Sequence, residues 1–187
     1  MNEAGEELAG QTVVLIGGSA GIGLETARRA RAEGAKVVLT GRNPERLEKA
    51  AGEVGAEDTA AFDADDYDAL GSFLDDLPKP IDHVLVTAGA PHYAPPLEMS
   101  PEEARDGLAG HAVQALQVAK GIDGGIRPGG ALLLMGGTGG RRIGRGYEIV
   151  NFVTAAMPAL TASLALDLAP VRVNLIAPGF VDTPLSA

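Results

Sequence analysis

The chain has 187 residues, a formal net charge of −10 and no cysteine. This length suits a single domain with a sizeable core. The acidic balance excludes a surface that binds nucleic acid or anionic membrane through clustered Lys and Arg, and the lack of cysteine excludes disulfides and thiolate metal sites. We expect a soluble cytoplasmic protein with no metal, because no apolar run approaches the roughly 20 residues of a membrane helix and the N-terminus lacks the features of a signal peptide.

The first predicted element is a strand that breaks into glycines and reopens as a helix. Residues 12–23 read Thr-Val-Val-Leu-Ile-Gly-Gly-Ser-Ala-Gly-Ile-Gly, and a helical pattern follows over 24–30. Glycines without a Cβ let the backbone turn sharply and approach a diphosphate, while the helix start offers N–H groups and a positive dipole end. This stretch predicts a dinucleotide site. Its candidate contacts are Gly17, Ser19, Ala20, Gly21, Ile22 and Gly23.

Strands and helices alternate along the rest of the chain. Further strands are predicted over 35–40, 59–62, 83–87, 131–135 and 171–176, and further helices from residue 44 and over 66–77, 101–121 and 149–168. Such alternation predicts an α/β fold in which a parallel sheet carries helices on both faces. Right-handed crossovers favour the doubly wound, Rossmann-type order 3-2-1-4-5-6, with ligands near the switch between strands 1 and 4.

The loop after the second strand indicates which dinucleotide is bound. An NAD site places a carboxylate there for the ribose hydroxyls, but this loop holds Arg42 and Asn43. An arginine can pair with a 2′-phosphate and stack on adenine, and Ser19 adds a hydroxyl donor. We therefore predict NADP(H) over NAD(H), with a solvated role for Arg42 as the alternative.

The spacing Gly-x-x-x-Gly-Ile-Gly at residues 17–23 resembles the first turn of the short-chain dehydrogenase/reductase family. Later turns match the family in order over nearly the whole chain, and the family would continue past residue 187 with a substrate-covering segment and a seventh strand, which is missing here. The resemblance implies adenine recognition after the third strand, a ribose site after the fourth and a nicotinamide site after the sixth. The residues it assigns to these sites are Asp63, Ala64, Ala88, Gly89, Pro178, Gly179, Val181 and Thr183.

The same resemblance locates the family's catalytic positions, and all four hold other residues. Gly137 stands in place of the serine, Val150 of the tyrosine, Thr154 of the lysine and His111 of the fourth-helix asparagine. Valine cannot transfer a proton, and threonine cannot supply a cation that lowers a neighbour's pKa. General acid–base catalysis, typically worth about 10²–10⁴-fold, has lost its usual groups.

Three side chains are candidate replacements. Tyr147 lies one turn before Val150, with Asn151 four residues further on; Thr138 offers a hydroxyl beside Gly137; and His111 has an ordinary pKa near neutrality. Each has a plain alternative, as a loop aromatic, a turn cap or a helix histidine.

Two further features concern ligands and partners. A glycine-rich loop carries Arg141, Arg142 and Arg145, which together with His92 and Tyr93 are candidates for an anionic substrate, a solvated loop being the alternative. The resemblance also implies a homodimer or homotetramer through the helices that begin near Pro101 and Ile149.

Three functions remain open at this point. The first is an NADP(H)-dependent short-chain oxidoreductase that acts on a carbonyl or alcohol substrate through a divergent catalytic site. The second is a catalytically impaired NADP(H)-binding sensor or partner protein. The third is a domain that binds no cofactor and serves only in assembly.

Overall fold

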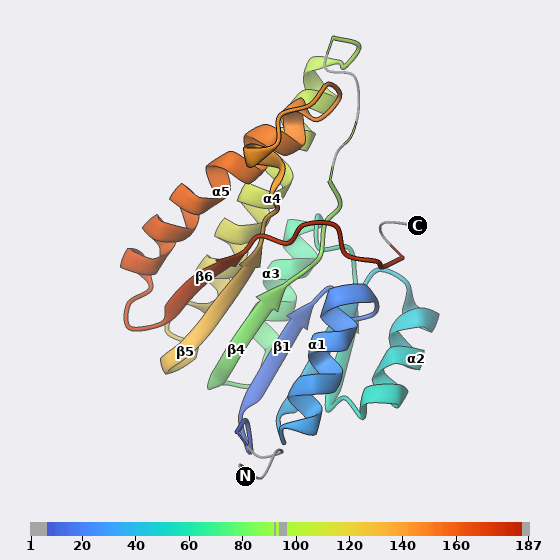
Figure 1. The fold of residues 1–187 in the computed structure, drawn as a ribbon. Helices are drawn as coiled ribbons and strands as arrows, with labels where there is room; N and C mark the ends of the chain where they lie inside the picture. Colours follow the sequence, from blue (N-terminus) through green and yellow to red (C-terminus); the bar gives the residue numbers. More distant parts are fainter. Residues whose placement is uncertain (1–6, 92, 94–96, 185–187) are drawn as a thin grey trace, which may run out of the picture.

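Six strands and five helices follow one another in the computed structural model, which describes residues 7–91, 93 and 97–184 (Figure 1). The strands are β1 (Thr12–Ile16), β2 (Lys36–Gly41), β3 (Asp58–Ala61), β4 (Ile81–Val86), β5 (Ile126–Met135) and β6 (Arg172–Ile176). The helices are α1 (Gly21–Ala32), α2 (Pro44–Val54), α3 (Tyr67–Asp76), α4 (Pro101–Ile122) and α5 (Glu148–Asp167), and a 3₁₀ turn spans Gly139–Arg141. Every predicted element is present, and only β5 starts well before its predicted beginning.

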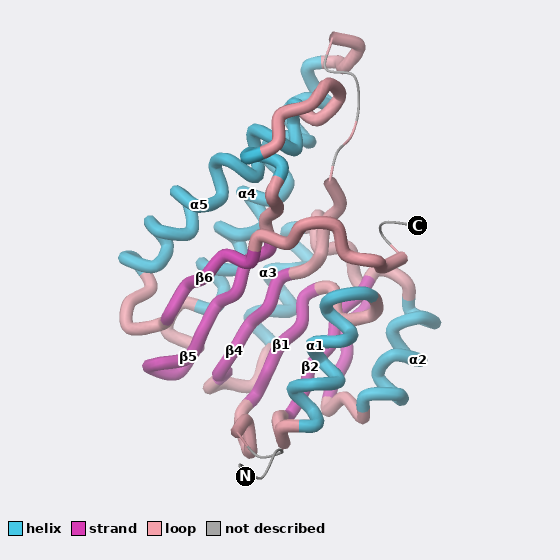
Figure 2. Tube along the Cα trace, viewed as in Figure 1, coloured by secondary structure: helices cyan, strands magenta, loops and turns pink. Residues whose placement is uncertain are grey.

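The six strands form one parallel sheet in the order β3-β2-β1-β4-β5-β6. Val13 of β1 lies opposite Val37 of β2, and Val14 lies opposite Val84 of β4. Figure 2 shows the sheet with α1 and α2 in front of it and α3 and α4 behind it. The doubly wound α/β class and the order 3-2-1-4-5-6 are thereby confirmed, and the described residues contain no seventh strand. The carboxyl ends of β1 and β4 flank the switch point.

Alternate residues of β1 enter the two halves of the core. Val13 and Leu15 pack with the apolar sides of α1 and α2, whereas Val14 and Ile16 pack with those of α3, α4 and α5. This division follows from the period of two in a strand, and burial of both faces explains why the strand is an uninterrupted apolar run. The rigid centre of the sheet thus ends directly at the glycine turn.

The early start of β5 comes from an irregular stretch in front of its apolar core. Ile126 pairs with Ile81, and the register then shifts before Ala131 pairs with His83. Gly129 has a φ of +82°, in the left-handed region that favours glycine. The apolar pattern over 131–135 could not reveal this extension, because residues 127–130 are Arg-Pro-Gly-Gly.

Helix α5 departs from the expectation that no segment is long and apolar enough to cross a membrane. By length and composition it passes that test, alone among the helices of the described residues. In this fold α5 packs against β6 and α4, and the polar side chains of Asn151 and Thr161 lie on its buried side. We interpret it as a packed helix of the domain.

Candidate cofactor site

The turn after β1 depends on glycine because three backbone segments meet there. Gly17 has a φ of +97°, and a Cβ atom on it would lie 2.5 Å from the backbone nitrogen of Ala88. A Cβ atom on Gly23 would collide with the carbonyl oxygen of Gly17. Glycine at these two positions therefore lets α1 begin tightly against the ends of β1 and β4, as the sequence pattern predicted.

The start of α1 is the part of this turn that suits an anion. Its N-cap residue, Ala20, supplies no side-chain cap, and neither does Tyr147 at α5, whereas α2, α3 and α4 begin with side-chain caps from Asn43, Asp66 and Ser100. The first N–H groups of a helix have no partner inside the helix, and they carry the positive end of its dipole. At α1 these donors are left for a ligand, and a diphosphate fits the glycine cradle beside them.

Two threonines that sequence reasoning passed over hold the turn in place. The Thr87 hydroxyl donates to the Gly17 carbonyl at 3.0 Å, and the Gly17 N–H donates to the Thr40 hydroxyl at 3.2 Å. Thr87 directly follows β4, and Thr40 is the last residue but one of β2. A hydroxyl at the carboxyl end of each neighbouring strand was the available signal.

The two residues predicted for the adenosine end lie together. Arg42 follows β2 and Asp63 follows β3, and their side chains form an ion pair of 3.8 Å with 67% and 50% of each side chain exposed. Asp63 also accepts the Asp65 N–H at 3.1 Å. Exposed pairs of this kind contribute little stability, so the Arg42 guanidinium is available to another anion.

Ser19 and Asn43 have structural contacts at the same end of the site. Asn43 accepts the Arg46 N–H at 2.8 Å and thereby caps α2. Ser19 is 6% exposed and packs against Gly41, where a Cβ atom would lie 2.7 Å from the serine hydroxyl. These contacts account for both residues without a ligand, and their cofactor role stays a prediction.

The segment after β6 runs across the carboxyl edge of the sheet towards α1 (Figure 1). It contains Pro178, Gly179, Val181 and Thr183, the residues predicted for the nicotinamide end. Thr183 reaches the glycine turn, because a Cβ atom on Gly21 would lie 3.4 Å from its side chain. The chain thus brings the end of its last strand back to its first turn.

The helix face that corresponds to the family's tyrosine and lysine is covered by backbone. The Thr154 hydroxyl donates to the Val150 carbonyl and accepts the Gly140 N–H, both at 2.6 Å. A Cβ atom on Gly140 would lie 2.9 Å from the backbone nitrogen of Ala155, and one on Gly137 would lie 3.1 Å from the Thr154 methyl carbon. Glycines therefore let the loop pack directly on α5, and the side chains at the two positions carry no titratable group.

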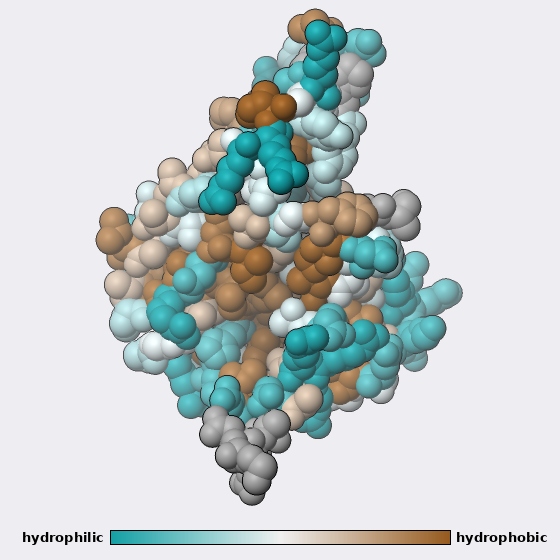
Figure 3. Space-filling view, in the orientation of Figure 1, coloured by the Kyte–Doolittle hydropathy of each residue, from teal (hydrophilic) through white to brown (hydrophobic). Residues whose placement is uncertain are grey.

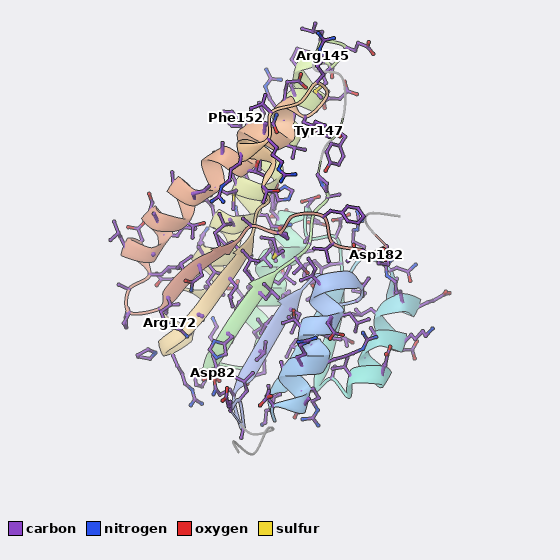
Figure 4. All side chains as sticks on the ribbon, viewed as in Figure 1. Asp82, Arg145, Tyr147, Phe152, Arg172 and Asp182 are labelled. Atoms are coloured by element: carbon purple, nitrogen blue, oxygen red, sulfur yellow. The ribbon has the colours of Figure 1, made fainter. Side chains whose placement is uncertain are left out.

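The candidate replacements do not form a connected group. Tyr147 precedes α5, is 48% exposed, and packs edge-to-face on Tyr93 with ring centroids 5.4 Å apart (Figure 4). Thr138 precedes the 3₁₀ turn, where its carbonyl accepts the Arg141 N–H. Within the described part of the chain, no hydrogen bond joins Tyr147, Thr138 or His111 to another of the three.

His111 lies on α4 beneath the loop that follows β4. A Cβ atom on Gly89 would lie 3.4 Å from the ring atom Nε2 of His111. Burial lowers the pKa of His111, and the nearby Asp65 carboxylate opposes that shift in part. The ring is therefore largely neutral at pH 7, which suits a proton acceptor better than a donor.

The basic loop projects beyond the carboxyl edge of the sheet, with Arg145 and Tyr147 on its outer part (Figure 4). Arg141, Arg142 and Arg145 are exposed. His92, which the sequence also placed in this region, lies outside the described residues.

The sequence and the fold both match known proteins. A family model described as enoyl-(acyl carrier protein) reductase matches residues 17–187. A short-chain dehydrogenase/reductase of Stachybotrys chlorohalonatus, ATR9, is 31% identical over 193 residues, which cover 92% of this chain and 74% of that protein. The chain belongs to the short-chain dehydrogenase/reductase family. Members of this oxidoreductase family bind a nicotinamide cofactor, and the glycine cradle fits its diphosphate.

Two further similarities concern members of the family with a stated cofactor. The NADP-dependent (R)-specific alcohol dehydrogenase of Lentilactobacillus kefiri is 30% identical over 197 residues, covering 96% of this chain and 77% of the enzyme. The structure of BdcA in complex with NADPH superposes with a TM-score of 0.82 at 25% identity and covers 96% of this chain and 74% of that one.

Proposed function

We propose that this protein is an NADP(H)-dependent oxidoreductase that acts on a carbonyl or alcohol substrate through a divergent catalytic site. The observation that carries the proposal is the glycine cradle beside the uncapped start of α1. The N–H groups there hold a diphosphate, and Thr40 and Thr87 fix the cradle to the ends of two strands. When bound, the cofactor supplies or accepts a hydride.

Arg42 supports the choice of NADP(H). Its guanidinium lies at the end of β2, where a carboxylate would serve NAD(H), and its pairing with Asp63 is exposed and weak. A 2′-phosphate would form shorter, charge-assisted hydrogen bonds with the guanidinium. The NADP-dependent alcohol dehydrogenase and the NADPH complex to which the chain is similar support this choice, whereas a similar xylitol dehydrogenase structure holds NAD+, so Arg42 is the observation that decides it.

A titration with NADPH and NADH tests this proposal. We expect NADPH to bind at least tenfold more tightly than NADH, and Arg42→Ala to reduce the affinity for NADPH by about 10- to 100-fold, the loss of a hydrogen bond to a charged group. Arg46→Ala, which changes an exposed arginine on α2, is the matched control. Equal affinities for NADPH and NADH would contradict the cofactor assignment, and no binding of either would leave only an assembly role.

Proton transfer is the part of the proposal that needs a new residue, and Tyr147 is our candidate. Of the three replacements, Tyr147 is the one that stands at the start of α5, and it is 48% exposed. Steady-state oxidation of NADPH with a panel of aldehydes, ketones and quinones supports the oxidoreductase if any compound is turned over.

A second function is favoured by the loop packed on α5. Because Val150 and Thr154 offer no titratable group and the Thr154 hydroxyl is engaged by Gly140, the protein would bind NADP(H) without turnover and serve as a sensor or partner protein. Tight NADPH binding with no oxidation of the cofactor by any compound of the panel would favour this second function.

We also propose that two copies associate through α4 and α5 in the cytoplasm. Phe152 and Leu166 on α5 are 59% and 81% exposed, and Figure 3 shows pale to brown, apolar surface along α5 where α1 and α2 are largely teal. Ultracentrifugation should find a dimer or tetramer, and Ala159→Arg on the exposed side of α5 should give a monomer, whereas Ala32→Arg on α1 should not. A monomeric unmodified protein would overturn this assignment.

A further inference from the structure

One polar side chain of α5 is buried without a hydrogen-bond partner. The Asn151 side chain is 7% exposed, and no donor from any residue that the structure describes reaches its Oδ1. Thr161 on the same helix is buried to a similar extent, but its hydroxyl donates to the Met157 carbonyl at 2.8 Å. Nearly all buried acceptors in proteins have a partner, and an unpaired one destabilises the conformation that buries it. The unpaired Oδ1 of Asn151 therefore calls for a reason.

The 3₁₀ turn over Gly139–Arg141 lies directly on this amide. A Cβ atom on Gly139 would lie 3.4 Å from Asn151 Oδ1 and 3.0 Å from the Thr154 hydroxyl oxygen. The absence of a side chain at Gly139 thus lets the backbone of the turn lie close against α5. The Asn151 amide lies between its own helix and a backbone segment that gives Oδ1 no donor. Moving the turn away from α5 would open this acceptor to solvent.

The turn is attached to α5 by the hydrogen bond from the Gly140 N–H to the Thr154 hydroxyl. The Arg141 and Arg142 N–H groups donate to carbonyls at the start of the turn itself, at 3.0 and 2.9 Å, so these bonds do not join it to the helix. None of the residues of the turn is buried, and the side chains of Arg141 and Arg142 are exposed. A segment that buries so little apolar surface opens at a low cost in free energy.

Glycines flank the turn on both sides. Six of the eleven residues from 136 to 146 are glycine, so backbone freedom is available before and after the turn. Gly146 has a φ of +79°, in the left-handed region that favours glycine. Hinges in proteins are a few residues that absorb large changes in φ and ψ, and glycine does this with the least steric conflict. The segment can therefore move as a short flap between two glycine-rich ends.

We propose that the 3₁₀ turn is a hinged cover over α5, closed in this structure, and that the unpaired Asn151 amide biases it towards opening. Opening lets water or a ligand donate to Oδ1, which removes the penalty of the closed form. It also uncovers Val150 and Thr154, the positions that correspond to the family's tyrosine and lysine. The balance between the Gly140–Thr154 hydrogen bond and the unpaired acceptor thereby sets access to this helix face, whether or not the protein turns over a substrate.

Amide hydrogen exchange, followed by NMR, tests the cover. We expect the N–H groups of Gly140, Arg141 and Arg142 to exchange roughly 100-fold faster or more than that of Val14 in β1, at rates that urea below the unfolding transition does not change, because the opening is local. Asn151→Leu removes the unpaired acceptor and should slow exchange of the three turn amides by roughly tenfold. Unchanged or faster exchange in Asn151→Leu would overturn the proposal, as would turn amides that exchange only through global unfolding.

Two further variants keep the test independent of how well Asn151→Leu folds. Gly139→Ala places a Cβ atom against the Thr154 hydroxyl and should speed exchange of the turn amides by about fivefold or more, with the Val14 amide unchanged. Thr161→Val removes a buried hydroxyl that does have a partner on the same helix, so it is the matched control and should leave the turn amides unchanged. Unchanged turn amides in Gly139→Ala, or a slowing in Thr161→Val equal to that in Asn151→Leu, would overturn the proposal.

Discussion

The loops that follow β1 and β5 both depend on glycine, but with opposite consequences for ligand binding. After β1, Gly17 and Gly23 bring backbone segments together in a way that leaves the first N–H groups of α1 without partners. After β5, Gly137 and Gly140 bring the loop onto α5, and the Gly140 N–H is taken up by Thr154. The close approach after β1 leaves N–H groups for a ligand, whereas the close approach after β5 leaves the Gly140 N–H bonded within the protein.

In this chain the cradle and the helix face that corresponds to the family's tyrosine and lysine are thus built from different kinds of atoms. The cradle rests on backbone atoms and on hydroxyl groups at strand ends, whereas proton transfer rests on the side chains of one helix face. A sequence can therefore keep the first and replace the second without disturbing the sheet that supports both.

The largest effect is expected from the loop after β5, where Tyr147 is the candidate proton donor. If Tyr147 donates the proton, Tyr147→Phe lowers the steady-state rate of NADPH oxidation by about 10²–10⁴-fold, because general acid catalysis is lost. Binding of NADPH should change less than twofold. Tyr93→Phe removes the hydroxyl of the packed neighbour and serves as the control. An unchanged rate in Tyr147→Phe would remove this residue from the chemistry.

The next largest effect is expected from a change in the glycine turn after β1. Gly23→Ala places a Cβ atom against the Gly17 carbonyl, and such overpacking costs about 1–3 kcal/mol. The cradle must widen to accept it, so the affinity for NADPH should fall by roughly tenfold or more. Gly52→Ala on α2 is the matched control, since a Cβ atom there meets nothing within 4 Å. Calorimetric titration of the two variants should separate them clearly.

The smallest effect sharpens the comparison by testing the contact between the loop and α5. Thr154→Val keeps the shape of the side chain but leaves the Gly140 N–H without its acceptor, which costs about 1–3 kcal/mol. For a chain of this size, each kcal/mol lowers Tm by about 2–4 °C. Thermal unfolding measures the loss, and NADPH affinity should stay within twofold of the unmodified protein. A Tm equal to that of the unmodified protein would show that the contact contributes no stability.

Much of the fold was predictable from the sequence, because the apolar runs and the glycine turn depend on interactions between residues that are close in the chain. The uninterrupted run over 12–16 and the spacing of 17–23 specify a buried strand that ends at a cradle. The cap role of Asn43 was also readable, since an asparagine directly before Pro44 is a typical helix start. The cofactor role of Asn43 stays a prediction beside this cap.

The rest of the site depends on contacts between distant residues, which local patterns do not contain. Neither Thr154 nor Gly140 by itself predicts a contact between the loop and α5. Only the fold brings the Thr154 hydroxyl to the Gly140 N–H. The pairing of Arg42 with Asp63 follows from the neighbouring positions of β2 and β3 in the sheet.

The path of the segment after β6 links the stability of the sheet edge to events at its centre. Among the described residues β6 pairs with β5 alone, and Thr183 in the segment that follows β6 lies beside Gly21. A ligand that contacts both the glycine turn and Thr183 binds only when this segment lies against the turn. Because the ligand binds that form alone, it lowers the fraction of molecules in which β6 is locally open. The amide protons of β6 thereby become reporters of cradle occupancy, and saturation with such a ligand slows their exchange with solvent.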